Sequence, residues 1–522
     1  MRGADLLVAS LKAAGVTKIF SLSGNQIMPV YDACFEQDVD IVHVRHESAA
    51  VFMAEAWAQL TGGLGVALVT AAPGFANALG ALYTAKGSES PVLLLAGDSP
   101  VGMDGKGAFQ ELDQVAMASP LTKLSQRPRS ADALADAVAA ASRTARAWRP
   151  GPVHIALPFD VLNASTEASP PPPEDCLPEP ATAEASDLAG LIAGSARPLI
   201  VTGPALNLSR TGDLHDRLEA ATDAPVLALE SPRGLGDPAM GDLKSLMAES
   251  DLVVSLGKRI DFTLGFGDGA TAWAVVDSEE TAMAAARANL GDALVHATSA
   301  DPLAMAEALS QGAHPARADW TARAAALLAR RPAASTGPGI SSAAVAAAVE
   351  RRLKAAGSAV ACLDGGEFGQ WAQAGVSTGQ RLINGPAGAI GGGLCYGIAA
   401  KLARPDAAVY AMMGDGSAGF HFSEFETAAR AGANFVAVIG ADGVWNAEHQ
   451  IQLRDYGANR LIGCDLSDAR YDQAVAALGG HAEYVEHEAD LDAALERAEN
   501  SGKPACVVVK IIGEAAPSPG AH

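Results

Sequence analysis

Short apolar runs alternate with amphipathic stretches along the first third of the chain. Apolar positions spaced three and four residues apart favour helices, whereas continuous apolar runs between turn residues favour buried strands. The pattern predicts helices over 4–14, 27–36, 47–60, 74–86 and 130–147, and strands over 17–21, 40–44, 64–70, 91–96 and 152–156. Strands that alternate with helices in this way are typical of a parallel sheet covered by helices.

The same alternation recurs in the middle and in the last third of the chain. It predicts strands over 198–202, 225–229, 251–256, 273–277, 407–413 and 435–440, and a helix over 393–403. A Pro-rich stretch from Ser169 and a later stretch rich in Ala, Arg, Pro and Gly are typical of linkers. We therefore predict an α/β fold of three doubly wound parallel-sheet domains, over 1–165, 186–320 and 340–513, with linkers over 166–185 and 321–339 and a short tail over 514–522.

Composition narrows the class of protein further. A chain of 522 residues is too long for one core, and 49% hydrophobic with 19% charged residues is typical of well-buried globular domains. A net charge of −23 argues against a nucleic-acid partner or an anionic membrane surface. We find neither an apolar run of about 18 residues nor a signal peptide, so no membrane span is expected. The six cysteines form no Cys-x-x-Cys pair, which favours reduced thiols and a cytoplasmic location.

Two carboxylates follow apolar runs in the last domain. Asp415 comes directly after 407–413 and Gly414, and Asp442 follows the next run 27 residues later. The carboxyl ends of parallel strands are where open α/β sheets bind ligands, and two acidic oxygens suit a hard cation such as Mg²⁺ bridging to a phosphate. Because Gly-Asp-Gly alone is also an ordinary turn, the spacing of the pair carries the prediction.

This motif, in the last of three α/β domains, resembles that of the thiamine diphosphate (ThDP) enzymes, the acetolactate synthase and pyruvate decarboxylase superfamily. The resemblance implies ThDP and Mg²⁺ as cofactors and a diphosphate-binding last domain, and it leaves FAD open. It assigns the metal to Asp415, Asp442 and the carbonyl of Val444, and the diphosphate to the Gly414 turn with Gly416 and Ser417. The family normally has Asn as its second ligand. Asp442 adds a negative charge, which puts cofactor affinity and metal preference in question.

The first domain resembles the pyrimidine-binding domain of that family. The similarity lies in Arg45–Ala50 and Thr70–Asn77, and the family's activating glutamate maps onto Glu47. A carboxyl group held against the pyrimidine ring nitrogen, away from water, keeps a pKa high enough to exchange a proton. The alternative is a solvated Glu that favours the helix dipole at a helix start.

A glycine-rich stretch, Gly385–Gly393, resembles the loop under the thiazolium ring. By this match the Gly388 carbonyl accepts from the exocyclic amine of the cofactor, and Ile390 is the wedge that keeps the cofactor bent. The stretch also reads as a turn before the helix over 393–403, which does not exclude that role.

The branch of the family depends on a few further positions. Gly107–Asp113 resembles acetolactate synthases and 2-hydroxyacyl-CoA lyases, in which the residue matching Gln110 reaches the active site and Phe109 forms part of its wall. Thr263 and Ile451 stand where acetolactate synthase has its acceptor-binding Arg and its specificity Trp. Both replacements weaken recognition of a second 2-oxoacid.

Two polar residues are candidates for action on the reacting carbon. Asn25 matches a position that faces the thiazolium carbon, and Glu448 matches a catalytic Glu of pyruvate decarboxylases. Asn25 is suited to hydrogen-bond a developing alkoxide and Glu448 to move a proton. The alternative for Glu448 is a solvated position on a helix. His43, His46 and His421 are interpreted as structural.

We therefore predict a ThDP- and Mg²⁺-dependent lyase or carboligase that decarboxylates a 2-oxoacid and/or joins the product to an aldehyde or ketone. Family members share each cofactor between two chains, which implies a homodimer or homotetramer. One alternative is a 2-hydroxyacyl-CoA or oxalyl-CoA lyase, which Asp261–Gly267 resembles, although the ten residues after Ile512 are short for a CoA cover. The other alternative is a non-catalytic scaffold, against which the retention of Glu47, Asp415 and Ile390 argues.

Overall fold

The computed structural model describes residues 1–170, 172, 182–268, 272–312, 316–331 and 337–517. It contains three parallel sheets, each with helices packed on it, which confirms the predicted fold class. Contacts divide the chain into two compact units. Unit 1 comprises 1–175 and 334–516, with the first and third sheets, and unit 2 comprises 176–333 and 517–522, with the second sheet.

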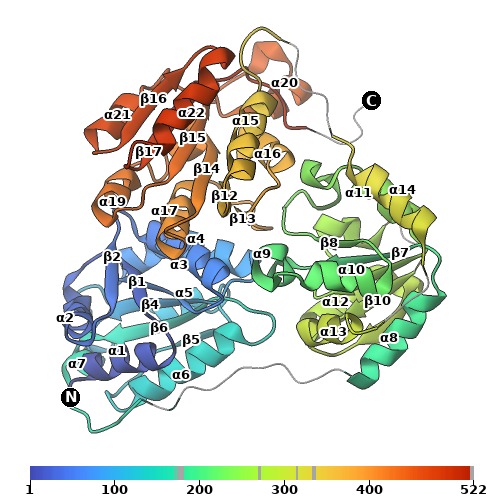
Figure 1. Ribbon diagram of the computed structural model, residues 1–522. Helices are drawn as coiled ribbons and strands as arrows, with labels where there is room; N and C mark the ends of the chain where they lie inside the picture. Colours follow the sequence, from blue (N-terminus) through green and yellow to red (C-terminus); the bar gives the residue numbers. More distant parts are fainter. Residues whose placement is uncertain (171, 173–181, 269–271, 313–315, 332–336, 518–522) are drawn as a thin grey trace. The chain divides into compact units, whose positions relative to one another are not determined.

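The first sheet has six parallel strands in the order β2-β1-β3-β4-β6-β5 (Figure 1). Its strands are β1 (Lys18–Ser21), β2 (Asp40–His43), β3 (Gly65–Val69), β4 (Val92–Asp98), β5 (Leu124–Gln126) and β6 (Val153–Pro158). Its helices are α1 (Gly3–Ala13), α2 (Met28–Gln37), α3 (Glu47–Thr61), α4 (Pro73–Gly87), α5 (Gln114–Ala118), α6 (Ala133–Arg146) and α7 (Phe159–Asn163).

The third sheet repeats this order, as β13-β12-β14-β15-β17-β16. Its strands are β12 (Ala359–Leu363), β13 (Gln380–Ile383), β14 (Ala408–Gly414), β15 (Val436–Ala441), β16 (His481–Val485) and β17 (Ala505–Lys510). Its helices are α15 (Ser342–Ala355), α16 (Gly366–Gly375), α17 (Gly393–Ala403), α18 (Asp415–Ala418), α19 (Glu424–Ala431), α20 (Asn446–Asp455), α21 (Tyr471–Ala477) and α22 (Leu491–Glu499).

The sheet of unit 2 has five parallel strands in the order β11-β10-β9-β7-β8. They are β7 (Pro198–Thr202), β8 (Val226–Ala228), β9 (Leu252–Leu256), β10 (Trp273–Val276) and β11 (Leu294–Thr298). The helices are α8 (Thr182–Gly194), α9 (Leu208–Thr211), α10 (Leu214–Thr222), α11 (Leu243–Glu249), α12 (Glu280–Leu290), α13 (Pro302–Leu309) and α14 (Ala318–Leu328).

Interior strands such as β3, β9 and β12 are buried at every position, because helices cover both faces of a parallel sheet. Within unit 1, α3 packs on α17, and one apolar core runs from the first sheet to the third. Figure 1 shows these two helices between the blue and the orange sheets. A buried hydrogen bond from the Tyr396 hydroxyl to Glu55, 2.9 Å long, crosses this helix pair.

Two predicted linkers overlap helices. Residues 321–328 belong to α14, whose Trp320, Ala324 and Leu327 are buried in the core of unit 2. Residues 182–185 likewise belong to α8, which buries Leu188 and Ile192. Apart from Pro172, residues 171–181 of the Pro-rich linker lie outside the described residues, as do 332–336 of the second linker and 518–522 of the tail.

No helix in the described part of the chain is both long and apolar enough to cross a membrane. Five cysteines fall among the described residues, and all five are buried and free. Cys176 lies outside them.

Candidate active site

The predicted site residues of the first domain lie at the carboxyl edge of its sheet. Glu47 follows β2 and opens α3, which His46 caps by accepting the Ser48 N–H at 3.2 Å. The Glu47 side chain is only 9% exposed, and its Oε2 accepts a hydrogen bond from Asn77 Nδ2 at 3.0 Å. A Cβ at Gly74 would lie 3.3 Å from Oε1, so glycine keeps the space beside that oxygen open.

Residues from a short 3₁₀ helix, the end of β3 and a loop form a hydrogen-bonded chain nearby. Gln26 Nε2 donates to Gln110 Oε1 at 2.6 Å, and Thr70 Oγ1 donates to Gln26 Oε1 at 2.8 Å. Gln110 has a φ of 58°, in the left-handed region, where a non-glycine residue costs about 1–3 kcal/mol and often marks a functional site. Asn25 starts the short 3₁₀ helix beside Gln26 and is exposed.

Asp415 and Asp442 follow β14 and β15, which are paired neighbours with Gly414 opposite Gly440. Asp415 accepts hydrogen bonds from the Gly416 N–H at 2.9 Å and from the Gly443 N–H at 3.0 Å. Asp415 is therefore tied directly to the loop that carries Asp442, as the 27-residue spacing predicts.

The loop after β15 is fixed by a short antiparallel contact. Val444 is bridged to Asp465, the Trp445 N–H donates to the Cys464 carbonyl at 2.7 Å, and Asp442 Oδ1 accepts the Val444 N–H at 3.3 Å. A Cβ on Gly416 would lie 2.8 Å from the Trp445 ring, so this ring requires the glycine after Asp415. Ser417 is buried in α18, which is a single turn.

Both carboxylates have raised proton affinities. Burial raises the pKa of Asp415, and burial together with the charge of Asp415 raises the pKa of Asp442 to about 6. Among the described residues, no group of three or more His, Cys, Asp or Glu side chains is placed so that it could hold a metal ion. A cation at this place would therefore take the two carboxylates together with backbone or ligand oxygens.

The glycine-rich loop after β13 is held by a buried carboxylate. Asp364 accepts hydrogen bonds from the N–H groups of Gly365, Gly391 and Gly393, at 2.7 to 3.1 Å. Burial raises the pKa of Asp364 to about 6.

The apex of this loop is exposed at Gly388, whose φ of 68° suits glycine. Asn384 Nδ2 donates to the Ala389 carbonyl at 2.8 Å. A Cβ on Gly365 would lie 2.9 Å from the Ile390 side chain, so this glycine makes room for Ile390.

Other predicted residues lie outside these clusters within a single chain. Glu448 is exposed on α20, and Ile451 on the same helix is 45% exposed. Phe109 is 78% exposed. Thr263 is buried in unit 2, where its N–H donates to Asp261 Oδ1 at 3.0 Å.

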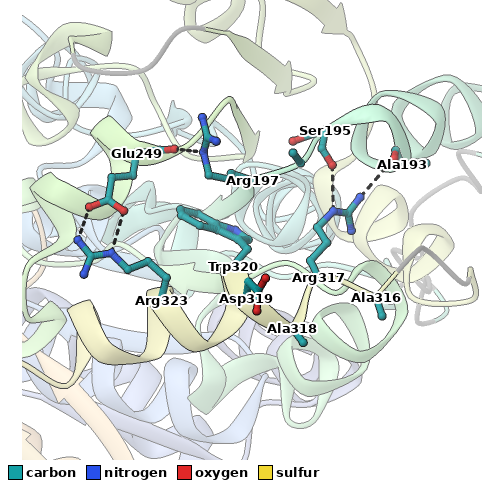
Figure 2. Close-up of a pocket in the computed structure, with 11 residues that line it drawn as sticks. Ala193, Ser195, Arg197, Glu249, Ala316, Arg317, Ala318, Asp319, Trp320 and Arg323 are labelled. Atoms are coloured by element: carbon teal, nitrogen blue, oxygen red, sulfur yellow. Dashed lines mark hydrogen bonds and ion pairs between the residues drawn. The ribbon is translucent and has the colours of Figure 1, made fainter.

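A cavity of about 760 Å³ lies within unit 2 and contains none of the predicted site residues (Figure 2). Its arginines are already engaged: Arg323 forms an ion pair with Glu249, and Arg317 donates to the Ser195 carbonyl at 2.9 Å. The clusters of candidate site residues described above lie outside this cavity, at the carboxyl ends of strands in unit 1.

Comparison with known proteins gives a family match for each of the two domains of unit 1. Residues 1–117 match the N-terminal TPP binding domain of thiamine pyrophosphate enzymes, and residues 364–509 match the C-terminal TPP binding domain. A probable acetolactate synthase of Mycobacterium bovis is 32% identical over 98% of this chain and 95% of that protein. The chain belongs to the thiamine diphosphate-dependent enzyme family.

Other relatives spread over several branches of the ThDP family. Human 2-hydroxyacyl-CoA lyase 2 is 27% identical over 91% of this chain and 84% of that protein. A solved structure, the thiamine diphosphate-dependent 4-hydroxybenzoylformate decarboxylase of Rhodococcus jostii RHA1, superposes with a TM-score of 0.83 at 21% identity, over 98% of this chain and all of that one. At that identity the likeness supports the fold alone.

The resemblance and the enzyme class predicted from the sequence are thereby confirmed, and the enzyme class removes the scaffold alternative. The two matched domains contain Glu47 and Asp415 respectively. Gln26 and Asp364, which take part in these clusters, were not predicted as site residues. Only Asp364 had a signal in the sequence, because it follows an apolar run just as Asp415 does.

Proposed function

We propose that this protein is a ThDP- and Mg²⁺-dependent lyase or carboligase that acts on the carbon–carbon bond next to a carbonyl of a 2-oxoacid. The observation that carries the proposal is the pair Asp415 and Asp442 at adjacent strand ends, with raised pKa values that a divalent cation would lower. When bound, ThDP supplies the electron sink for breaking or making that bond.

In this proposal, residues of the chain bind and orient the metal and the cofactor, and they move protons. Asp415, Asp442 and the Val444 carbonyl hold Mg²⁺, while the Gly414 turn with Gly416 and Ser417 receives the diphosphate. The buried Glu47 exchanges a proton with the pyrimidine ring nitrogen, and its bond from Asn77 fixes the other carboxylate oxygen.

The remaining residues act around the reacting carbon. When ThDP is bound, the Gly388 carbonyl would accept a hydrogen bond from its amine, and Ile390 would support it. Gln110, held by Gln26, and Asn25 face the substrate. Glu448 moves a proton.

A substrate panel tests the proposal directly. Calorimetry should detect Mg²⁺-dependent ThDP binding, and 2-oxoacids with and without aldehyde acceptors should give products identifiable by mass spectrometry. Absence of ThDP binding would refute the proposal. Cleavage confined to acyl-CoA substrates would favour the second candidate, a 2-hydroxyacyl-CoA lyase, which the likeness to the human lyase supports.

We also propose a cytoplasmic location from the use of cysteine.

The active unit is expected to be a dimer, or a tetramer built from dimers. Hydrophobic side chains are exposed on and after α20, including Ile451, Tyr456 and Ile462, the last of them 80% exposed, as at a surface that another chain covers. Light scattering along a dilution series should show activity falling with the dimer fraction. A fully active monomer would contradict this.

Decarboxylation, or ligation to an uncharged aldehyde or ketone, is expected to outpace the formation of acetolactate from two pyruvates. Thr263 lacks the guanidinium that would bind an acceptor carboxylate, and Ile451 lacks the ring of the specificity Trp. Hydrogen bonds to charged groups contribute about 1.5–3 kcal/mol. The assay follows CO₂ release and acetolactate side by side from pyruvate. Acetolactate as the dominant product would mean that other residues bind the carboxylate.

A further inference from the structure

The turn that presents Glu47 is held by a buried carboxylate from the third-sheet domain of the same chain. Glu424, the first residue of α19, is 0% exposed. Its Oε1 accepts the N–H of Arg45 at 2.9 Å and the N–H of His46 at 3.1 Å, and its Oε2 accepts the Thr427 hydroxyl at 2.6 Å. One side chain therefore fixes the two residues directly before Glu47.

A second connection reaches the first turn of α3 from the glycine-rich loop. His421 Nδ1 lies 2.6 Å from the Gly391 carbonyl, which can only accept, so Nδ1 carries the proton. His421 Nε2 lies 2.7 Å from Ser48 Oγ. Burial lowers the pKa of His421, which favours its neutral ring. The residues around Glu47 are therefore held from the third-sheet domain at two places, by Glu424 before Glu47 and by His421 after it.

We propose that Glu424 is a positioning residue for Glu47. Without its oxygen, the Arg45 and His46 N–H groups lose their acceptor, and the turn is free to move the Glu47 carboxyl away from the cofactor ring. This inference rests on the proposed function. In the proposed dimer Glu47 serves the cofactor held by the partner subunit, so Glu424 acts on the site opposite the one that its own Asp415 serves.

Paired variants separate positioning from stability. Glu424→Ala is expected to slow exchange of the proton on the ThDP thiazolium carbon, followed by NMR after acid quench, by about 100-fold, the cost of a misplaced reacting group. ThDP affinity should stay within a few-fold of wild type. Amide hydrogen exchange at Arg45 and His46 should accelerate already in the cofactor-free protein. Glu424→Gln keeps an oxygen acceptor for both N–H groups and should restore wild-type rates of thiazolium proton exchange and amide exchange, with ThDP affinity again close to wild type.

Wild-type exchange at the thiazolium carbon in folded Glu424→Ala would overturn the proposal. If that variant does not fold, Thr427→Val serves instead, because it removes only the hydroxyl that orients Glu424 Oε2. It should slow the same exchange less strongly, and Thr427→Ser should restore it. A Thr427→Val protein with wild-type proton and amide exchange would equally overturn the proposal.

Hybrid dimers test which of the two sites Glu424 serves. They combine Glu424→Ala with Asp415→Ala, a substitution that prevents its own chain from holding a cofactor. When both substitutions are in one chain beside a wild-type partner, the dimer should bind one ThDP, whose proton exchanges slowly. When each chain carries one substitution, the dimer should also bind one ThDP, but its exchange should be wild-type. The reverse pattern would mean that Glu424 acts on the site of its own Asp415, against the proposal. A wild-type protein that binds no ThDP or forms no dimer would instead refute the proposed function.

Discussion

Glu47→Gln is expected to lower turnover by about 10²–10⁴-fold, the usual contribution of a general acid or base. The amide has the same size as the carboxylate, and its oxygen still accepts a hydrogen bond from Asn77, which is 3.0 Å away in the wild type. It cannot take up or release a proton at neutral pH. Folding and ThDP affinity should therefore stay close to wild type while proton exchange at the thiazolium carbon is lost.

The measurements are steady-state CO₂ release, thiazolium proton exchange by NMR and ThDP binding by calorimetry. Glu36→Gln is a matched control, because Glu36 lies exposed on α2 and the chemical change is identical. If Glu47→Gln keeps most of its activity, the assignment of Glu47 is wrong. A variant that also loses ThDP affinity would point to a binding role instead.

Part of the interior of the fold follows closely from the sequence. The predicted strand over 198–202 and the predicted helix over 393–403 have the same bounds as β7 and α17. Both are buried elements, in which the need to cover apolar surface fixes the pattern. The interior strands β12 and β17 were not predicted, although nearly all of their residues are buried. The edge strands β5, β11, β13 and β16 were not predicted either; their side chains are partly exposed and lack a continuous apolar run.

Composition misled the placement of the second linker. Residues 321–328 are rich in Ala, which is a good helix former, and tertiary packing of Leu327 on the core of unit 2 makes them part of α14. Local composition does not distinguish a connecting segment from a helix whose apolar stripe is narrow.

The candidate site was predictable where chemistry follows strand order. Asp415 and Asp442 lie together because β14 and β15 are consecutive in the chain and adjacent in the sheet. Glu424 was not predictable in this way, because its partners Arg45 and His46 are nearly 380 residues away in the chain. Such a contact depends on how α3 packs on α17, and a single sequence does not encode it as a pattern.

Asp415→Ala is expected to weaken Mg²⁺-dependent ThDP binding by more than about 100-fold. Loss of a residue that merely supports a metal ligand typically costs 10–100-fold in metal affinity, and Asp415 is proposed as a ligand itself. The substitution also removes the acceptor for the Gly443 N–H, which loosens the loop that carries Asp442 and Val444. Calorimetry with ThDP at fixed Mg²⁺ measures the effect, and equal affinity in wild type and variant would contradict the site.

Asp442→Asn is the discriminating partner of that variant. Asn keeps an oxygen ligand and an acceptor for the Val444 N–H, but it removes the charge that lies beside Asp415. Binding of ThDP with Mg²⁺ should therefore persist in Asp442→Asn. Because the pKa of Asp442 is raised to about 6, the wild-type carboxylate becomes protonated as pH falls through that value, whereas Asn has no proton to gain. Affinity measured from pH 7.5 to 5.5 should fall more steeply in wild type than in Asp442→Asn; parallel curves would mean that protonation of Asp442 does not control binding in this range.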